Sequence, residues 1–360
     1  MHIDALTLTD FRNFKEAKLS PERQINLIIG DNGSGKTSLL ESIYCLGSGR
    51  SFRPGTHKQI IRHDTFSFTI FARGTDEQGD KHTLGFQRDR EGLVKIRVDG
   101  DLVRRFGQMA KLVPVQLMTP ETVELVLGGP KLRRQFLDWG VFHVEHRYIE
   151  AITGFNHVLK QRNSLLKQRL QSSESAYWEA KFVELGEQVA KERKGYWNGF
   201  EPVLQERLKH FLPQYQFKIQ LKQGWDAELT LREAIERNKS AEERYGHAIV
   251  GPHKAELKMT ANGEDVKAIL SRGQLKLFVA AIKVVQGEYL FAQTGVQCIY
   301  LVDDITAELD ADSQQKFCEA LIATKAQLFV SAINKGELPD IITSADTKMF
   351  HVEHGTVKEL

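Results

Sequence analysis

The sequence predicts an α/β fold: a mixed sheet that carries a phosphate-binding loop, an antiparallel β subdomain beside it, and an inserted helical lobe. Three observations predict this fold. A glycine-rich run, GDNGSGKT at residues 30–37, follows an apolar stretch at residues 25–29. Short alternating segments at residues 66–98 are separated by turn residues, as in β-hairpins. Beyond residue 130, long helical periodicity with few glycines replaces both patterns.

Composition restricts the possible classes of protein. The chain has 360 residues, 41% of them hydrophobic, which suits one large domain with an insertion or two domains. The net charge of +2 gives no global attraction to nucleic acid, so any polyanion-binding surface must be local. Cys45, Cys298 and Cys318 are widely spaced and predict reduced buried thiols, not a disulfide framework or a zinc site. No run approaches the roughly 18 apolar residues of a membrane span, and the first residues resemble a strand, so we expect a cytoplasmic protein.

The glycine-rich run matches the P-loop pattern G-x-x-x-x-G-K-[ST] and predicts nucleoside triphosphate binding. Its glycines allow backbone N–H groups to turn toward phosphate oxygens, and the following helix adds its positive end. Lys36 is expected to reach the β and γ phosphates, and Thr37 to offer its hydroxyl to Mg²⁺. The alternative is a glycine turn before an ordinary helix. The expected nucleotide-binding residues are Gly30, Asp31, Asn32, Gly33, Ser34, Gly35, Lys36, Thr37 and Ser38.

The remaining elements follow in order. Residues 3–11 read as a strand, and the segments of 66–98 as the antiparallel subsheet, with Asp99-Gly100 as its clearest turn. An apolar segment at 112–118 ends at Pro120, and helical periodicity begins near Lys131. No heptad is sustained there, so we expect a compact helical bundle and no long coiled coil. The predicted parts are 1–130 (first part of the head), 131–244 (helical lobe) and 245–360 (second part of the head).

Two motifs follow the lobe. CIYLVDDI at 298–305 places two carboxylates at the end of an apolar strand, as in a Walker B motif. Asp303 is expected to hold Mg²⁺ and Asp304 to orient the attacking water; the alternative is a strand that ends in two solvated aspartates. LSRGQLK at 270–276 predicts a serine-capped helix whose N-terminus faces an anion. Its expected contact residues are Ser271, Arg272, Gly273 and Gln274.

These motifs carry a family resemblance. The P-loop, LSRGQ, Walker B and the ELD at 308–310 occur in the order of ABC-type ATPases, and TDFRNF at 9–14 resembles the opening strand of the SMC branch. The 235 residues between Lys36 and Ser271 (271 − 36) exceed what a transporter subunit needs and are too few for an SMC arm. With GRSFR at 49–53, GGPKLRRQFLD at 128–138, LKQRN at 159–163 and GPHK at 251–254, nearly the whole chain resembles the RecF family.

The resemblance implies an ABC-type ATPase head that uses ATP and Mg²⁺. In such heads the signature of one subunit closes over the nucleotide on its partner, so ATP drives homodimerisation and hydrolysis releases it. It further implies a weak, DNA-stimulated ATPase of recombinational repair and replication restart. Such a protein binds DNA at single-strand gaps and single-strand/duplex junctions, acts with RecO and RecR to help load recombinase, and supports the SOS response.

The resemblance also assigns individual residues. Arg12 and Asn13 match a nucleotide-contacting position, and Gln116 in VPVQLMTP is assigned as the Q-loop residue that senses Mg²⁺. Asp304 stands where most ABC ATPases have glutamate, so its shorter carboxylate predicts slow hydrolysis. Ser331 stands nearest to the usual switch histidine and is a candidate γ-phosphate sensor.

Basic residues in the lobe predict a DNA-binding surface. The stretch 131–170 has eight basic and three acidic side chains, a local balance of +5, although a solvated helical face is the alternative. A second basic set is Arg50, Arg53, Lys58 and Arg62. The candidate DNA contacts are Arg133, Arg134, Lys160, Arg162, Lys167 and Arg169.

There are two rival functions. One is a transporter nucleotide-binding subunit, which the motif spacing disfavours. The other is a P-loop protein that does not dimerise.

Overall fold

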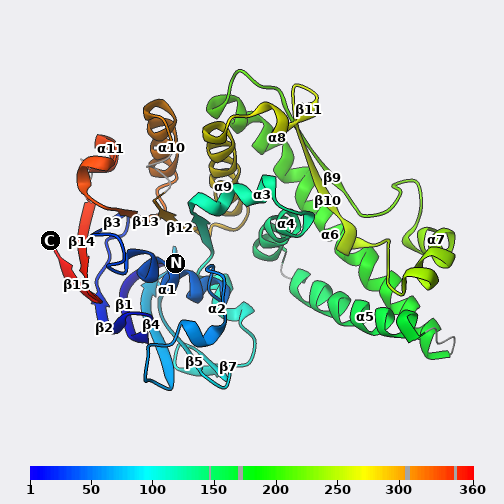
Figure 1. The fold of residues 1–360 in the computed structure, drawn as a ribbon, viewed down its shortest axis with the longest axis horizontal. Coiled ribbons are helices and arrows are strands. Elements are labelled where there is room, and N and C mark those ends of the chain that lie inside the picture. Colours follow the sequence, from blue (N-terminus) through cyan, green and yellow to red (C-terminus); the bar gives the residue numbers. More distant parts are fainter. Residues whose placement is uncertain (146, 169–172, 305–308, 344–346) are drawn as a thin grey trace. The chain divides into compact units, whose positions relative to one another are not determined.

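The computed structural model describes residues 1–145, 147–168, 173–304, 309–343 and 347–360, which divide into two compact units (Figure 1). The head unit comprises Met1–Thr122 and Arg272–Leu360, and the inserted unit comprises Val123–Ser271. The α/β class and the insertion are as predicted. Both boundaries of the insertion differ from the predicted 131–244.

A six-stranded sheet forms the centre of the head unit, in the order β15-β14-β3-β13-β12-β8. All neighbours in it are parallel except the β14–β15 hairpin. Four of the five residues of β3 are fully or almost fully buried, as expected of a strand that is covered on both faces. The strands are β3 (Ile25–Ile29), β8 (Val115–Met118), β12 (Ile299–Asp303), β13 (Gln327–Ala332), β14 (Thr347–Glu353) and β15 (Thr356–Glu359).

A second six-stranded sheet in the head unit is antiparallel, in the order β2-β1-β4-β5-β6-β7. One apolar core is shared by this sheet, the parallel sheet and α1 (Lys36–Ser48). Further helices of the unit are α2 (Gly107–Leu112), α9 (Arg272–Thr294), α10 (Ala311–Ala323) and α11 (Asp340–Thr343). The antiparallel strands are β1 (His2–Phe11), β2 (Phe14–Leu19), β4 (Ser67–Thr75), β5 (Lys81–Asp89), β6 (Val94–Val98) and β7 (Asp101–Val103).

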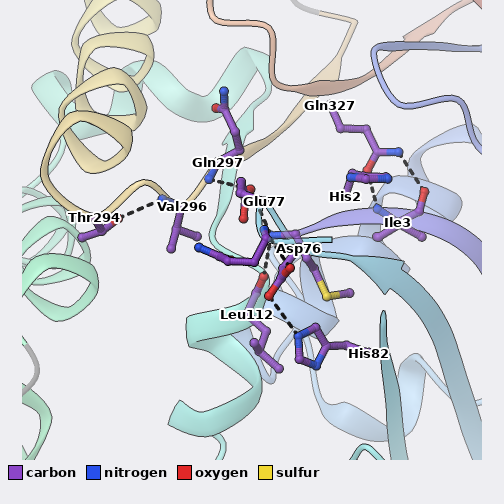
Figure 2. A network of polar contacts seen from close by, with 12 residues as sticks. His2, Ile3, Asp76, Glu77, His82, Leu112, Thr294, Val296, Gln297 and Gln327 are labelled. Atoms are coloured by element: carbon purple, nitrogen blue, oxygen red, sulfur yellow. Dashed lines mark hydrogen bonds and ion pairs between the residues drawn. The ribbon is translucent and has the colours of Figure 1, made fainter. Parts of the chain in front are cut away.

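Polar contacts join the two sheets at the start of β1 (Figure 2). The Gln327 side chain of β13 accepts a hydrogen bond from Ile3 N (2.7 Å) and donates one to Ile3 O (2.9 Å). Glu77, which follows β4, accepts from Gln297 N, which precedes β12 (2.9 Å). These buried or half-buried bonds fix the start of β1 beside the amino ends of the parallel strands.

The inserted unit combines helices with a three-stranded sheet, β11-β10-β9. Its longest helix, α6 (Ser173–Phe211), has 39 residues, about 58 Å at 1.5 Å per residue, and packs along α5 (Tyr148–Gln168). The insertion is thus a mainly helical lobe, as expected, with a small three-stranded sheet that the sequence analysis did not predict. The remaining elements are α3 (Glu124–Leu127), α4 (Pro130–Val144), β9 (Phe217–Lys222), α7 (Leu231–Tyr245), β10 (Glu256–Ala261), β11 (Glu264–Asp265) and α8 (Val266–Ile269).

Specific contacts explain why the insertion is longer than predicted. At its start, the Arg133 guanidinium donates to the carbonyls of Leu125, Val126 and Gly128, which ties residues 124–128 to α4. At its end, β10 pairs with β9 and therefore belongs to the inserted unit. No helix of the described ranges is long and apolar enough to cross a membrane.

Candidate functional site

The phosphate loop lies between β3 and α1 and depends on its glycines. Gly30, Gly33 and Gly35 have φ values of 151°, 80° and 124°, a region that favours glycine. A Cβ atom at Gly35 would lie 2.7 Å from Asn13 Nδ2, and one at Gly30 would lie 2.2 Å from the Val352 carbonyl oxygen. The loop conformation therefore requires glycine at both positions.

The donors of this loop suit an anion. Lys36 is 5% exposed, and its ammonium donates to the carbonyls of Gly30 (2.6 Å) and Asp31 (3.1 Å). The Ser34 hydroxyl is buried without a hydrogen-bond partner among the described residues. Because buried polar groups normally have partners, a buried lysine and an unused hydroxyl beside a glycine loop fit a phosphate ligand.

The Walker B strand meets the phosphate loop through Asp303. Its Oδ1 accepts a hydrogen bond from Thr37 Oγ1 (3.2 Å) at the start of α1 and from Ser331 Oγ (2.6 Å) on β13. Burial raises the pKa of Asp303, and the hydrogen bonds from Ser331 and Thr37 act in the opposite direction. Two oxygen donors, a carboxylate and a hydroxyl, are thus brought together where a hard cation such as Mg²⁺ would suit them.

Asp304, the next residue, has an unusual backbone. Its φ is 50°, a conformation that costs a residue with a side chain about 1–3 kcal/mol and is frequent in active sites. Its N–H donates to Ser331 Oγ (3.2 Å). The carboxylate lines the same cavity as the phosphate loop, where it could act on water.

A cavity of about 590 Å³ extends from the phosphate loop toward η1 (His57–Gln59), within the usual range of small-molecule sites. Arg12 and Asn13 line it, and Asn13 Nδ2 donates to the Ser34 carbonyl (2.8 Å), so both lie beside the phosphate loop. Arg53 and Lys58, which the sequence suggested for DNA, also line this cavity. Its lining includes Arg12, Asn13, Asn32, Gly33, Gly35, Lys36, Thr37, Ser38, Arg53, Lys58, Gln59, Ile61, His63, Arg90 and Asp304.

Gln116 lies elsewhere than its assigned role requires. It pairs with Tyr300, three positions before Asp303, and is 3% exposed. Its amide donates to Gln286 Oε1 of α9 (2.8 Å), and its oxygen lies 3.5 Å from Lys283 Nζ. Because both ends of the amide contact α9, the structure does not bring this side chain to Asp303 and Thr37.

The segment resembling a signature is at the surface. Ser271 and Arg272 are exposed, Gly273 and Gln274 are half-buried, and α9 begins at Arg272. Ser271 therefore immediately precedes a 23-residue helix, as the pattern predicted. In the ELD motif, Glu308 lies outside the described residues, whereas Asp310 caps α10 by accepting from Ser313 N (2.8 Å).

The predicted DNA contacts of the inserted unit separate into two groups. Arg133 is 8% exposed and forms a bidentate pair with Glu256 (2.6 and 2.8 Å). Arg162 is 5% exposed and pairs with Glu242 (2.6 Å). Since each guanidinium is buried against a carboxylate, neither remains a candidate DNA contact, which corrects the sequence-based assignment.

The other predicted DNA contacts are more accessible. Lys160 and Lys167 are exposed on α5. Arg134 is half-buried and donates to the Ala255 carbonyl (2.9 Å). Arg169 lies outside the described residues.

The sequence did not single out Glu41, which is 0% exposed and bonded to Arg12. The available signal was an acidic residue directly after two leucines in the helix that follows the phosphate loop, LLESI. A charge there requires a buried partner, which one sequence alone does not identify.

Comparison with known proteins identifies the family. Residues 2–358 match the model of the RecF/RecN/SMC N terminal domain. The chain is 46% identical to the DNA replication and repair protein RecF of Idiomarina loihiensis over 360 residues, covering 100% of both. It is 39% identical to that of Proteus mirabilis and 40% identical to that of Shewanella denitrificans, each with 99% coverage of both chains.

Solved structures agree on the fold. The recombination mediator protein RecF-ATPrS of the RecFOR pathway superposes with a TM-score of 0.89 at 24% identity, covering 100% of this chain and 98% of the other. An SMC head bound to the C-winged helix domain of ScpA gives 0.59 at 14% identity, covering 100% and 97%. The fold is therefore that of an ABC-type ATPase head. On its match to the family model and its full-length relatives, the chain belongs to the RecF family of DNA replication and repair proteins.

Proposed function

We propose that the protein is an ATP-dependent DNA-binding protein of recombinational repair and replication restart, which dimerises on ATP and releases on slow hydrolysis. The observation that carries this is the hydrogen bond from Thr37 to Asp303 (3.2 Å) beside a glycine loop in which the buried Ser34 hydroxyl has no partner among the described residues. The solved relative in complex with ATP, a recombination mediator of the RecFOR pathway, supports the same nucleotide.

In this proposal each residue of the site has one task. The loop amides and Lys36 bind the phosphates, and Thr37 with Asp303 holds Mg²⁺, which when bound neutralises charge on the transferred phosphoryl group. Ser331 donates to Asp303 (2.6 Å) and fixes the orientation of that carboxylate. Asp304 accepts a hydrogen bond from the attacking water. Its short side chain holds that water less well than glutamate would, so turnover is slow.

The proposed switch needs two copies of the chain. The exposed Ser271 at the start of α9 offers helix N–H groups and a hydroxyl to a phosphate held by the partner's loop. Two opposed anion-binding surfaces then neutralise one triphosphate, so binding and dimerisation stabilise each other. Hydrolysis removes the shared phosphate and weakens the dimer.

DNA binding is proposed for the accessible basic residues of the inserted unit, Lys160, Lys167 and Arg134. Contacts of this kind are made to phosphates, so affinity should fall steeply with salt and depend little on sequence. RecO and RecR are the proposed partners, gapped DNA or a single-strand/duplex junction the proposed substrate, and recombinase loading with support of the SOS response the proposed outcome. DNA should stimulate the weak ATPase.

The test combines assembly with DNA binding. The wild type should form a dimer with ATP and not with ADP, and bind gapped DNA more tightly with ATP. Lys36→Met should abolish both effects by removing the phosphate contact. Ser271→Arg should keep nucleotide binding in the monomer and prevent the dimer. A monomer at saturating ATP would contradict the switch and favour a P-loop protein that does not dimerise.

The DNA surface has its own test. Lys160→Gln/Lys167→Gln should lower affinity for gapped DNA about tenfold at moderate salt and reduce the salt dependence by about two counterions. Lys258→Gln, an exposed lysine on β10, is the control and should change neither. Equal effects of the two variants would argue against α5 as the contact.

A further inference from the structure

A buried acid lies immediately behind the phosphate loop. Glu41 is on α1, five residues after Lys36, and is 0% exposed. Its two oxygens accept from Arg12 Nε (2.9 Å) and Nη2 (2.6 Å) in a bidentate pair. It also accepts a hydrogen bond from the Ser51 hydroxyl, and Arg53 Nε lies 3.8 Å from Oε2. One carboxylate on α1 therefore contacts two other segments of the head unit, the end of β1 and residues 51–53.

Both arginines that contact Glu41 line the proposed nucleotide cavity. Arg12 has a left-handed backbone (φ 52°), and its Nη1 donates to the Gln59 carbonyl (2.8 Å) at the opposite side of the guanidinium. The side chain of Arg53 is 33% exposed. Arg53 lines the same cavity as Thr37, the proposed Mg²⁺ ligand, and Asp304, the residue that follows Asp303.

Electrostatics make this acid unexpected in a purely anion-binding site. A negative charge behind a triphosphate repels it, and a fully buried carboxylate is expensive to desolvate unless it is paired. Two guanidinium groups facing one cavity would in turn repel each other. A carboxylate between them removes that repulsion, and its fork-to-fork pairing fixes the plane of Arg12. The carboxylate weakens the attraction of the site for an anion, but it fixes the orientation of the arginines that would bind that anion.

We infer that Glu41 is a positioning residue that aims Arg12 and Arg53 at the phosphates of the bound nucleotide. Arg53 is assigned to the terminal phosphate because it is the more exposed of the two arginines and lines the cavity with Thr37 and Asp304, the residues proposed to act at the Mg²⁺ and at the attacking water. The inference rests on the proposed function, since it supposes that the cavity binds ATP. Glu41 itself touches neither nucleotide nor metal and acts through the two arginines.

The competing explanation is that Glu41 only holds the end of β1 and residues 51–53 against α1. That role changes stability alone. The positioning role changes how the site distinguishes ATP from ADP, because only ATP carries the terminal phosphate assigned to Arg53. The positioning role also couples Glu41 to Arg53, so the effect of changing Glu41 depends on whether Arg53 is present.

The experiment compares full-length wild type, Glu41→Gln, Arg53→Gln and the double variant. Calorimetric titration gives the affinities for ATP and ADP, single-turnover assays give the rate of cleavage, and melting temperature reports stability. Glu41→Gln should bind ADP at least as tightly as the wild type, because a nearby negative charge is lost. Its preference for ATP over ADP and its cleavage rate should each fall about tenfold or more. In the Arg53→Gln background, the same change should have little further effect on the ATP preference.

Two variants, one of them already in this set, keep the test interpretable if Glu41→Gln unfolds. Glu41→Asp keeps the charge and should recover part of the ATP preference. Arg53→Gln alters a partly exposed residue, so it should fold and lose the ATP preference by itself.

The inference is overturned if Glu41→Gln lowers only the melting temperature, if the two changes act additively, or if Arg53→Gln binds ATP like the wild type. A wild type that discriminates ATP from ADP yet stays monomeric would instead contradict the proposed switch and leave the role of Glu41 intact.

Discussion

The ion pair between Arg162 and Glu242 provides a quantitative test of how the inserted unit is stabilised. Glu242 is 1% exposed and accepts from Arg162 Nη2 (2.6 Å) and Ile249 N (2.9 Å). The guanidinium lies over the Phe182 ring at 4.9 Å, and its Nη1 has no hydrogen-bond partner among the described residues. Glu242→Gln therefore leaves a buried cation whose one remaining charged partner, within the part of the chain that the structure describes, is the 41%-exposed Glu179 (3.2 Å).

The expected loss follows from that burial. Removing one partner of a buried pair costs about 3–5 kcal/mol, and the remaining contact to Glu179 favours the lower end. For a unit of this size, about 3 kcal/mol corresponds to a decrease in melting temperature of roughly 6–12 °C. Thermal unfolding followed by circular dichroism or calorimetry measures it. Glu243→Gln, the same charge change at the exposed neighbouring residue, should stay within about 0.5 kcal/mol of the wild type.

Two results would refute this reasoning. One is a melting temperature of Glu242→Gln within a degree of Glu243→Gln. The other is an Arg162→Met variant that loses DNA affinity at low temperature without losing stability, which would return Arg162 to the candidate DNA contacts. Arg162→Met/Glu242→Leu should recover most of the stability, because apolar residues of similar volume replace buried ion pairs well.

Three other predictions concern pH and the nucleotide site. Burial lowers the pKa of His253 from 6.5 to about 4, so the stability that comes from keeping this imidazole neutral is complete above pH 6.5 and is lost as the pH falls toward 4. The loss in the free energy of unfolding is at most about 3 kcal/mol. His253→Gln should therefore flatten the curve of melting temperature against pH between pH 6.5 and 4, and an unchanged slope would contradict this prediction. Gly35→Ala should weaken ATP binding more than about 100-fold in a folded protein, since the φ of 124° at this position strains any residue that has a Cβ atom. In the same titration, Asn13→Ala, which loses one hydrogen bond, should weaken binding only about 3- to 10-fold. Ser331→Ala should slow single-turnover hydrolysis about tenfold with little effect on ADP affinity, because Asp303 loses its shortest hydrogen bond, and an unchanged rate would argue against the role of Ser331.

Local sequence patterns predicted the residues whose positions depend mainly on their neighbours in the sequence. Lys36 and Thr37 follow from a contiguous loop, and Asp303 from the end of an apolar strand, so their meeting at one edge of a parallel sheet could be anticipated. The predicted alternation in residues 66–98 likewise corresponds to β4, β5 and β6.

Long-range pairings explain the errors. Arg133 and Arg162 looked like solvated cations because Glu256 and Glu242 lie 123 and 80 positions away. The three-stranded sheet of the inserted unit was missed for the same reason, since β9 and β10 are separated by a helix. Gln116 fits a loop role by its place before Pro120, and only the contacts of α9 reveal that its amide is occupied.

The position of β3 has a consequence for biosynthesis. This strand leaves the ribosome early, but both its neighbours, β13 and β14, come about 300 residues later; Leu27 pairs with Val330. At 5–20 residues per second, the nascent chain waits about 15–60 s with that apolar segment unpaired. The glycine loop cannot acquire its final shape before then, because the carbonyl of Val352, which packs against Gly30, has not yet been synthesised. A ribosome-stalled fragment that ends before β13 should therefore bind chaperones well and nucleotide poorly.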